Sequence, residues 1–307
     1  LGHWKAALNL AGLYETGLGV PEDTEKAVLI VEGLMTQGVP AAFYKMGTYH
    51  SDSIGVRGDA SRAYAFWQLA ADKGNAAAQA FIGEKLDATY DSPGEGFWGN
   101  REVGLAMLEC SYAQGNGKGA FELGLTTGNT KTNTSQEYAR ALQVLHDAVK
   151  FGSAESASHL SSSFRDIDPL TGNTIDLVRA DRYRQIRAAL ERNPDLRLPN
   201  LDKVLPLPPA DMPAWDGLPQ TLVDAAKGVM QAPAVKPTPG AQRTGRAHIP
   251  QGHGLPAGQL PPVAERVAMP SHYRGQYIID TVGERGVVTL RPWLHLATRH
   301  TDCSISR

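Results

Sequence analysis

The most constraining feature of this sequence is a helix-breaking corner that recurs along its first half. In "AYAFWQLAADKGNAAAQAFIG" (63–83), an alanine-rich helical run stops at Gly74 and restarts at Asn75. Glycine favours the left-handed conformation that ends a helix, and an asparagine side chain caps the first N–H groups of the next helix. Comparable corners recur, with a period of 35 to 41 residues, at Gly38, Gly115 and Gly152. A period of this length is typical of a solenoid built from helical hairpins.

The residues around each corner fit a packed helical hairpin. Small residues that let two helices approach closely follow each corner at a fixed distance, and Gly12 marks a first, partial unit. They are Gly47, Gly83, Gly124 and Ser161. The second helices carry an apolar stripe at i, i+3 and i+4 spacing that includes Val31, Trp67, Leu108 and Leu145. N-cap residues precede them at Asp23, Asp59 and Asn100. We therefore predict a mainly α fold of about five hairpins.

These repeats resemble those of the Sel-one-like repeat family, a relative of the tetratricopeptide repeat. The segments "AGLYETGLGVPEDTEKA" (11–27) and "KMGTYHSDSIGVRGDASRAYAFWQLAADKG" (45–74) match its pattern closely, whereas 104–124 and 139–152 match more loosely. A fifth unit, roughly 153–193, departs from the pattern and is expected to cap the solenoid. The resemblance implies a right-handed superhelical α-solenoid, which we assign to residues 1–193.

The chain changes character at Pro194, because 15 of its 20 prolines fall between Pro194 and Pro270. Proline cannot continue a helix, so we predict an extended, partly polyproline II strap over 194–245 with one short helix at 220–230. The strap keeps large apolar residues that a disordered linker would lack, and we expect it to pack along the solenoid. These residues are Leu196, Leu198, Leu201, Val204, Leu205, Leu207, Met212 and Trp215.

The remaining region, 246–307, alternates between apolar and polar residues. The segments "GQYIIDTV" and "GVVTLRPWLHLATR" flank "GERG" (283–286), which predicts a β-hairpin within a small C-terminal region containing a few strands.

The two cysteines of the chain are Cys110 and Cys303. Cys110 lies near the apolar stripe of a repeat helix, so a buried free thiol is favoured there by about three to one. The sequence starts at Leu1, inside a repeat helix, and we expect an upstream segment to have been removed, either by artificial truncation or as a secretory signal.

Nothing in the sequence has the pattern of an enzyme. The net charge of −2 suggests neither nucleic acid nor an anionic membrane as a partner, and no apolar run approaches the ~20 residues of a membrane span. His248 and His253 lie five residues apart in a loop, but no cysteine or carboxylate stands near them at a metal-ligand spacing. Solvated or hydrogen-bonded histidines are therefore favoured, and we expect no catalytic, metal or cofactor site.

Binding to another protein is the favoured function, since a solenoid offers a long concave surface. First-helix positions beside the core are expected to line this surface, although an ordinary solvated role is favoured for any single one of them. These positions are Lys45, Thr48, Phe81, Glu84, Glu122 and His159.

One hairpin carries an insertion, "DATYDSPGEGFWGN" (87–100), which contains Tyr90, Phe97 and Trp98. Aromatic residues on a turn-rich insertion are typical anchors of protein interfaces. The alternative, at even odds, is that Phe97 and Trp98 fold back to cap the neighbouring hairpin.

The whole layout is similar to immunity proteins encoded beside type VI secretion effectors, including those that neutralise phospholipases. The resemblance implies a non-enzymatic periplasmic protein that binds and inhibits a cognate effector toxin, with a cytoplasmic location as the alternative. A general scaffold or adaptor would instead make several weak, salt-sensitive contacts. A cell-wall-ligand-binding protein or enzyme would need a polar pocket that uses His248 and His253.

Overall fold

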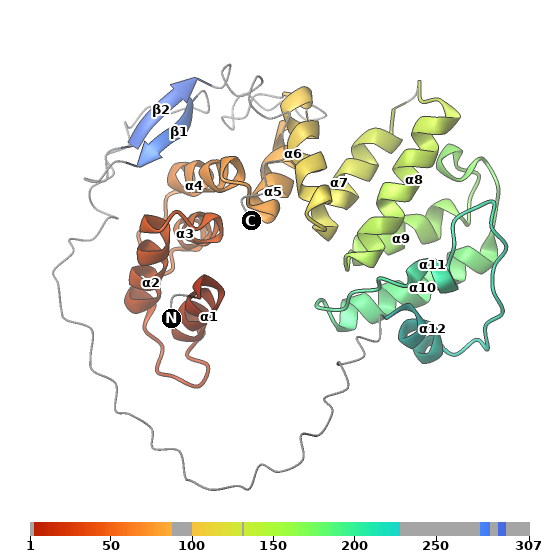
Figure 1. The fold of residues 1–307 in the computed structure, drawn as a ribbon, viewed down its shortest axis with the longest axis horizontal. Helices are drawn as coiled ribbons and strands as arrows, with labels where there is room; N and C mark the ends of the chain where they lie inside the picture. Colours follow the sequence, from red (N-terminus) through yellow and green to blue (C-terminus); the bar gives the residue numbers. More distant parts are fainter. Residues whose placement is uncertain (1–2, 88–99, 131, 228–276, 283–287, 293–307) are drawn as a thin grey trace, which may run out of the picture.

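The computed structural model describes residues 3–87, 100–130, 132–227, 277–282 and 288–292. Its helices α1 to α10 form five consecutive hairpins that follow one another along an arc (Figure 1). The hairpins are α1 (Trp4–Thr16) with α2 (Thr24–Thr36), α3 (Pro40–Asp52) with α4 (Ala60–Asp72), α5 (Ala76–Leu86) with α6 (Arg101–Ala113), α7 (Gly117–Gly128) with α8 (Ser135–Lys150), and α9 (Ala154–Ser163) with α10 (Leu177–Arg192). The predicted mainly α solenoid is confirmed, whereas the right-handed sense of its superhelix stays a prediction.

The corners between hairpins have the predicted backbone conformation. Gly38, Gly74, Gly115 and Gly152 have φ values between +74° and +98°, in the left-handed region that favours glycine. After the corner at Gly74, the Asn75 side chain accepts a hydrogen bond from the Ala78 N–H at 2.8 Å. The N-caps predicted at Asp23, Asp59 and Asn100 each accept a backbone N–H in the same way. Local sequence therefore determines where each of these helices starts and stops.

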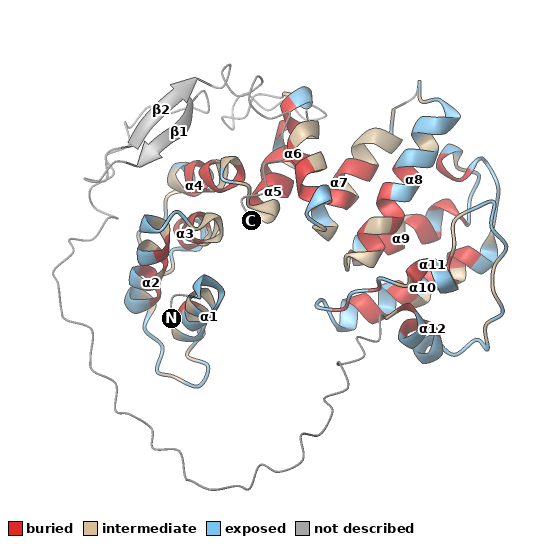
Figure 2. Ribbon diagram, in the orientation of Figure 1, coloured by how far each residue is buried: buried red, intermediate tan, exposed pale blue. Residues whose placement is uncertain are grey.

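Small residues hold neighbouring helices close together. A Cβ added to Gly83 on α5 would lie 2.9 Å from the carbonyl oxygen of Gly104 on α6, and the converse distance is also 2.9 Å. Such approaches leave no room for a side chain, so the two helix backbones pack directly against each other. The apolar stripes of the second helices fill the remaining space, and Val31, Leu108 and Leu145 are fully buried. Figure 2 shows this buried core running along the whole arc.

The strap packs against the last two hairpins, as predicted. Its four buried leucines join a core cluster formed with α8, α9 and α10, and Val204, Leu207, Met212 and Trp215 pack against that cluster. The strap is less extended than predicted, because Leu201–Val204 forms one turn of helix, α11. The short helix predicted at 220–230 is α12 (Pro219–Ala226). The strap and the last hairpin therefore share one core, while the predicted domain boundaries themselves stay predictions.

In the C-terminal part, strands β1 (Tyr277–Val282) and β2 (Val288–Pro292) pair antiparallel, with a register irregularity between Ile279 and Thr281. The pair lies near α4 (Figure 1). The other residues of the predicted C-terminal region, including His248 and His253, lie outside the described residues.

One sequence-based expectation in the core is wrong. Cys110 on α6 is buried but disulfide-bonded, and it is not the free thiol that its position near the apolar stripe had favoured. A free thiol and a disulfide can both be buried beside apolar residues, so the local sequence could not distinguish between them. Cys303 lies outside the described residues.

Candidate protein-binding surface

Along the first three hairpins, α1, α3 and α5 lie on the inner side of the arc, and α2, α4 and α6 lie on the outer side (Figure 1). The inner face, as we use the term, comprises the six described residues predicted to line the concave surface together with Lys118. They are Lys45 and Thr48 on α3, Phe81 and Glu84 on α5, Lys118 and Glu122 on α7, and His159 on α9. All of them except Lys118 are partly buried, so each side chain lies between the core and the solvent.

Ion pairs connect successive repeats along the inner face. Lys45 lies 2.6 Å from Glu15 of the preceding hairpin, and its ammonium group also lies over the Tyr49 ring. Two hairpins further on, Lys118 of the fourth hairpin reaches back to Glu84 of the third at 2.8 Å. Burial alone would lower the pKa of Lys118, but its hydrogen bond to Glu84 and the nearby carboxylates raise it. These lysines are therefore partly neutralised within the solenoid.

Glu122 differs from these residues because it has no ion pair or hydrogen bond within the described part of the chain. Its partial burial and the nearby Glu84 carboxylate raise its pKa, with a smaller contribution from Glu155. The ammonium groups of Lys118 and Lys85 act in the opposite direction, but the net shift of the pKa is upward. The partial desolvation of an unpaired carboxylate is unfavourable, and a cationic group from outside would relieve it. Glu122 is accordingly the inner-face residue most suited to a partner's basic group.

Aromatic rings flank this acidic position. Phe81 packs edge-on against Trp67 and stacks on Tyr64, with ring centroids 4.7 Å and 5.9 Å away. On the other side, Phe121 meets the His159 ring edge-on at 6.5 Å. Burial lowers the pKa of His159, which favours its neutral form. In the order of the repeats, Glu122 on α7 thus comes after the ring cluster of Phe81 on α5 and before His159 on α9.

Contacts between hairpins therefore involve several of the predicted inner-face residues, namely Lys45, Glu84 and His159. Thr48 donates its hydroxyl to the Tyr44 carbonyl oxygen at 3.3 Å, within its own helix, so its part in any interface is minor. The insertion residues Tyr90, Phe97 and Trp98 lie outside the described residues.

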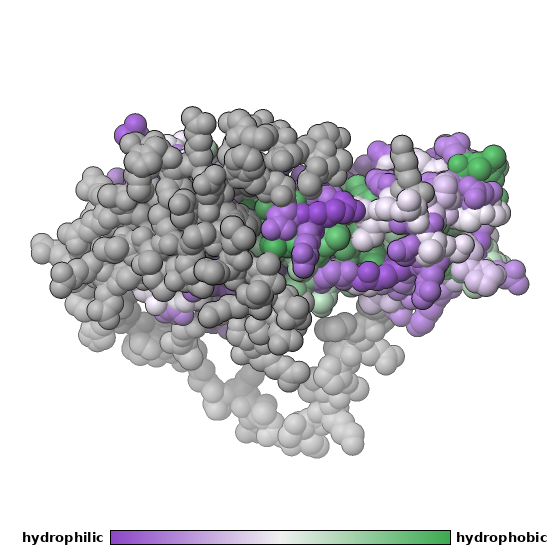
Figure 3. Space-filling view, turned by 90° about the horizontal axis from the view of Figure 1, so that it is seen from above, coloured by the Kyte–Doolittle hydropathy of each residue, from purple (hydrophilic) through white to green (hydrophobic). Residues whose placement is uncertain are grey.

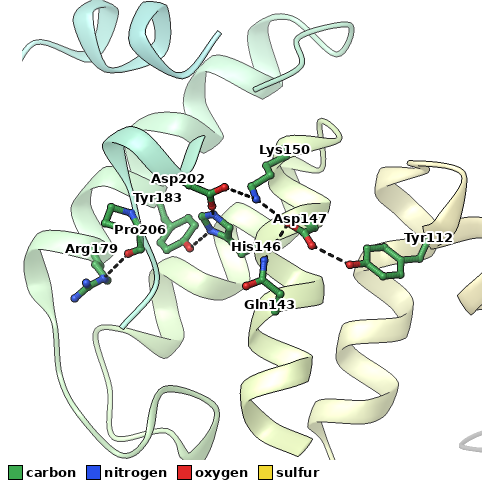
Figure 4. Close-up of polar contacts among 9 residues, drawn as sticks. All are labelled: Tyr112, Gln143, His146, Asp147, Lys150, Arg179, Tyr183, Asp202 and Pro206. Carbon is green, nitrogen blue, oxygen red and sulfur yellow. Dashed lines mark hydrogen bonds and ion pairs between the residues drawn. The ribbon is translucent and has the colours of Figure 1, made fainter. Parts of the chain in front are cut away.

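Sequence reasoning missed a chain of polar contacts between the solenoid and the strap (Figure 4). His146 on α8 is fully buried, with Nδ1 2.6 Å from the Tyr183 hydroxyl and Nε2 2.8 Å from the Asp202 carboxylate on α11. Because an ionised carboxylate only accepts, Nε2–H donates to Asp202, and the Tyr183 hydroxyl donates to Nδ1. Burial lowers the pKa of His146 and raises that of Tyr183, so both groups are neutral.

The same chain extends outward through ion pairs. Lys150 lies 2.7 Å from Asp202 and 2.9 Å from Asp147, which accepts the hydroxyl of Tyr112 on α6 at 2.8 Å. Burial opposes ionisation of Asp202, but its bonds from Lys150 and His146 lower its pKa overall. The polar chain therefore joins the third hairpin, the fourth hairpin and the strap.

Two buried arginines on α10 form a second connection, which we call the arginine clamp. Arg179 donates from Nε to the Pro206 carbonyl oxygen at 3.0 Å and from Nη2 to that of Ala210, and it pairs with Asp176. Arg182 donates to the carbonyl oxygens of Val204 and Pro213 and lies over the Trp215 ring. Proline has no backbone N–H, so carbonyl groups of a proline-rich segment often lack a backbone donor, and the side chains of the clamp supply donors to four of them.

One group of the polar chain and one of the clamp are closed to the solvent. Tyr183 is fully buried and Arg182 is 3% exposed, so a substrate has no access to them. Within the described ranges, no group of three or more potential metal-ligating side chains occurs. No described helix is long and apolar enough to cross a bilayer.

The helical hairpins, their corner glycines and their inner face define a helical-repeat protein. The Sel1 repeat model matches residues 4–29 and 40–75, and a domain of unknown function, DUF6396, matches residues 156–237. The latter span covers most of the last hairpin together with the strap, the two segments that the clamp joins.

Solved structures agree with the repeat assignment. Immunity protein PA5088 from Pseudomonas aeruginosa is 31% identical, with a TM-score of 0.51, over 68% of this chain and 75% of that chain. Immunity protein Pa5087 from the same organism is 33% identical, with a TM-score of 0.49, over 68% and 76% of the two chains. A Sel1 repeat protein from Oxalobacter formigenes shares the fold at 23% identity and a TM-score of 0.51, over 61% and 73%.

The chain therefore belongs to the Sel1 repeat family, as the sequence resemblance had indicated. Within it, the chain is similar to Pseudomonas aeruginosa immunity protein PA5088. The repeat fold and this similarity support a protein-binding role.

Proposed function

We propose that this protein is an immunity protein that binds and inhibits a cognate toxin through its inner face. The observation that carries the proposal is the unpaired, partly buried Glu122 between the aromatic rings of successive repeats. Similarity to immunity protein PA5088 supports the biological role. The sequence resemblance adds the class of toxin, a type VI secretion effector of phospholipase type.

The disulfide at Cys110 supports a location outside the reducing cytoplasm, since disulfides persist in oxidising compartments such as the periplasm. A periplasmic immunity protein would meet a toxin delivered there. We expect one tight, equimolar complex that buries roughly 1,600 Å² in total, the usual size of a specific interface.

The test is binding and inhibition with a purified candidate effector of phospholipase type. We expect a one-to-one complex by light scattering and loss of phospholipase activity at equimolar ratio. Glu122→Arg should raise the dissociation constant at least tenfold. The change replaces the carboxylate with a positive charge, which would repel a basic group of the partner. Glu191→Arg, an exposed change on α10, serves as the matched control.

Three results would contradict the proposal. An unchanged dissociation constant for Glu122→Arg and for Phe81→Ala would show that the inner face is not the interface. Many weak partners in place of one complex would favour the scaffold function. Turnover of a substrate by the protein itself would favour the enzyme alternative, whose histidines lie outside the described residues.

A further inference from the structure

A pocket lies where the strap meets the connection between α9 and α10. It has a volume of about 420 Å³, within the range of sites that hold a ligand or a partner's side chain. Six of its eleven lining residues are apolar, namely Phe164, Val178, Pro208, Pro209, Ala210 and Met212. At its base, the buried guanidinium of Arg179 is already paired with Asp176 and with strap carbonyl groups, so the pocket offers no free cation among its described lining residues.

Four large aliphatic side chains in the α9–α10 connection and at the start of α10 are more than half exposed, and one of them, Val178, lines the pocket. The exposed fractions are 73% for Ile167, 52% for Ile175, 62% for Leu177 and 55% for Val178. Figure 3 shows hydrophobic side chains at the end of the molecule where Figure 1 places this connection and the strap. We call the pocket and these four residues the end site. An exposed apolar group of this density is typical of an interaction surface.

The exposed residues of the end site are not explained by the end of the repeat stack, where the last hairpin has no further hairpin to pack against. Exposed apolar residues also occur on the first hairpin, where α1 exposes Trp4, Leu10 and Leu13. There, an end helix of a solenoid presents its stacking side. At the other end, the strap already covers the last hairpin and buries its own leucines against it. The aliphatic side chains of the end site remain exposed despite that cover.

The charges beside the end site specify what could cover it. In the described connection between α9 and α10 and in the strap residues that line the pocket, carboxylates predominate, with Asp166, Asp168 and Asp211 against the exposed Arg165. Asp168 also caps the short turn at Pro169–Thr171. A partner segment with an apolar tip and basic flanking residues would match both the pocket and its rim.

We propose that the end site binds an apolar side chain of a protein partner, flanked in that partner by lysine or arginine. The site shares no residue with the inner face, so it provides a separate contact. It therefore goes beyond the proposed function, and either site can fail without the other.

The test uses the full chain and three capped tripeptides, acetyl-Arg-Leu-Arg-amide, acetyl-Arg-Ser-Arg-amide and acetyl-Glu-Leu-Glu-amide. Methyl NMR should show saturable shifts of Val178 and Met212, in the millimolar range, with the first peptide. The second lacks the apolar tip and the third reverses the flanking charge, so we expect each to bind at least fivefold more weakly. Val178→Gln should weaken binding of the first peptide about tenfold, because it removes apolar contact area without adding charge.

Two further variants sharpen the result. Asp211→Lys should reduce the preference for the arginine peptide over the glutamate peptide. Leu29→Gln is the matched control, since Leu29 is 57% exposed on α2, far along the chain from the end site. The proposal is wrong if the three peptides bind equally, if no shift saturates, or if Val178→Gln and Leu29→Gln behave alike.

Discussion

The first four hairpins and the strap-bearing end are held together by different physical means. Between neighbouring repeat helices the contacts are apolar and close, as at Gly83 and Gly104, where a Cβ would have no room. Between α10 and the strap, buried Arg179 and Arg182 bond to backbone carbonyl groups. Apolar contacts repeat because each hairpin repeats, whereas the clamp occurs once and joins segments of unrelated sequence. The solenoid can therefore vary in length, while the strap depends on a few specific side chains.

The largest expected effect lies in the clamp. Arg182→Met should lower the free energy of unfolding by about 3 kcal/mol, because the carbonyl oxygens of Val204 and Pro213 lose their donor. Urea denaturation measures the loss, and limited proteolysis should show faster cleavage between residues 205 and 215.

Arg184→Met is the control on the same helix. Arg184 is exposed and contacts Asp181 at the surface, so the change should stay within about 0.5 kcal/mol. Equal effects of the two variants would mean that the clamp does not hold the strap.

Replacing two glycines of the repeat region by alanine should change the free energy of unfolding in opposite directions. Both changes should be smaller than that of Arg182→Met. Gly83→Ala should destabilise by about 1 to 2 kcal/mol, since its Cβ meets the Gly104 carbonyl and Leu108. Gly33→Ala on α2 meets no atom within 4 Å and should stabilise by about 1 kcal/mol through helix propensity. Thermal unfolding of both variants gives the comparison, and two changes of the same sign would contradict the close-packing argument.

The same contrast explains what the sequence could predict. Corners, caps and helix boundaries follow from residues within about five positions of one another, so Gly74, Asn75 and Asp59 predicted them correctly. Lys45 contacts Glu15, and Lys118 contacts Glu84, because the repeat period places these residues at facing positions of neighbouring hairpins. The contact of His146 with Asp202 joins residues 56 apart in non-repeating sequence, and no local pattern indicates it. The strap leucines indicated that the strap packs, but they carried no information on which side chains hold its backbone.

Low pH should loosen the strap through His146. Burial lowers its pKa below the ordinary value of about 6.5, so the unfolded chain takes up the proton more readily. The contribution of His146 to the free energy of unfolding is therefore complete above about pH 6.5. It decreases below that pH with a slope of at most about 1.4 kcal/mol per pH unit. His146→Gln should flatten this slope between pH 6.5 and 5.

His50 on α3 provides the comparison within the repeats, because burial also lowers its pKa. His50→Gln should reduce the slope as well, but without changing how the pH affects cleavage of the strap. If both variants change strap cleavage alike, the two regions unfold as one unit and the distinction between them fails.

The smallest effect on stability is expected at Glu122, on the inner face between the two regions. Its pKa is raised by burial and by Glu84, so the folded state holds the proton more tightly than the unfolded chain. The ionised form is therefore unfavourable above the raised value, and that penalty disappears as the pH falls. Glu122→Gln should accordingly stabilise the protein slightly at pH 7, by less than about 0.5 kcal/mol, with no gain at pH 4. A lower free energy of unfolding for Glu122→Gln at pH 7 would mean that the carboxylate stabilises the folded protein. An unchanged or higher value is the result that agrees with a role in binding a partner.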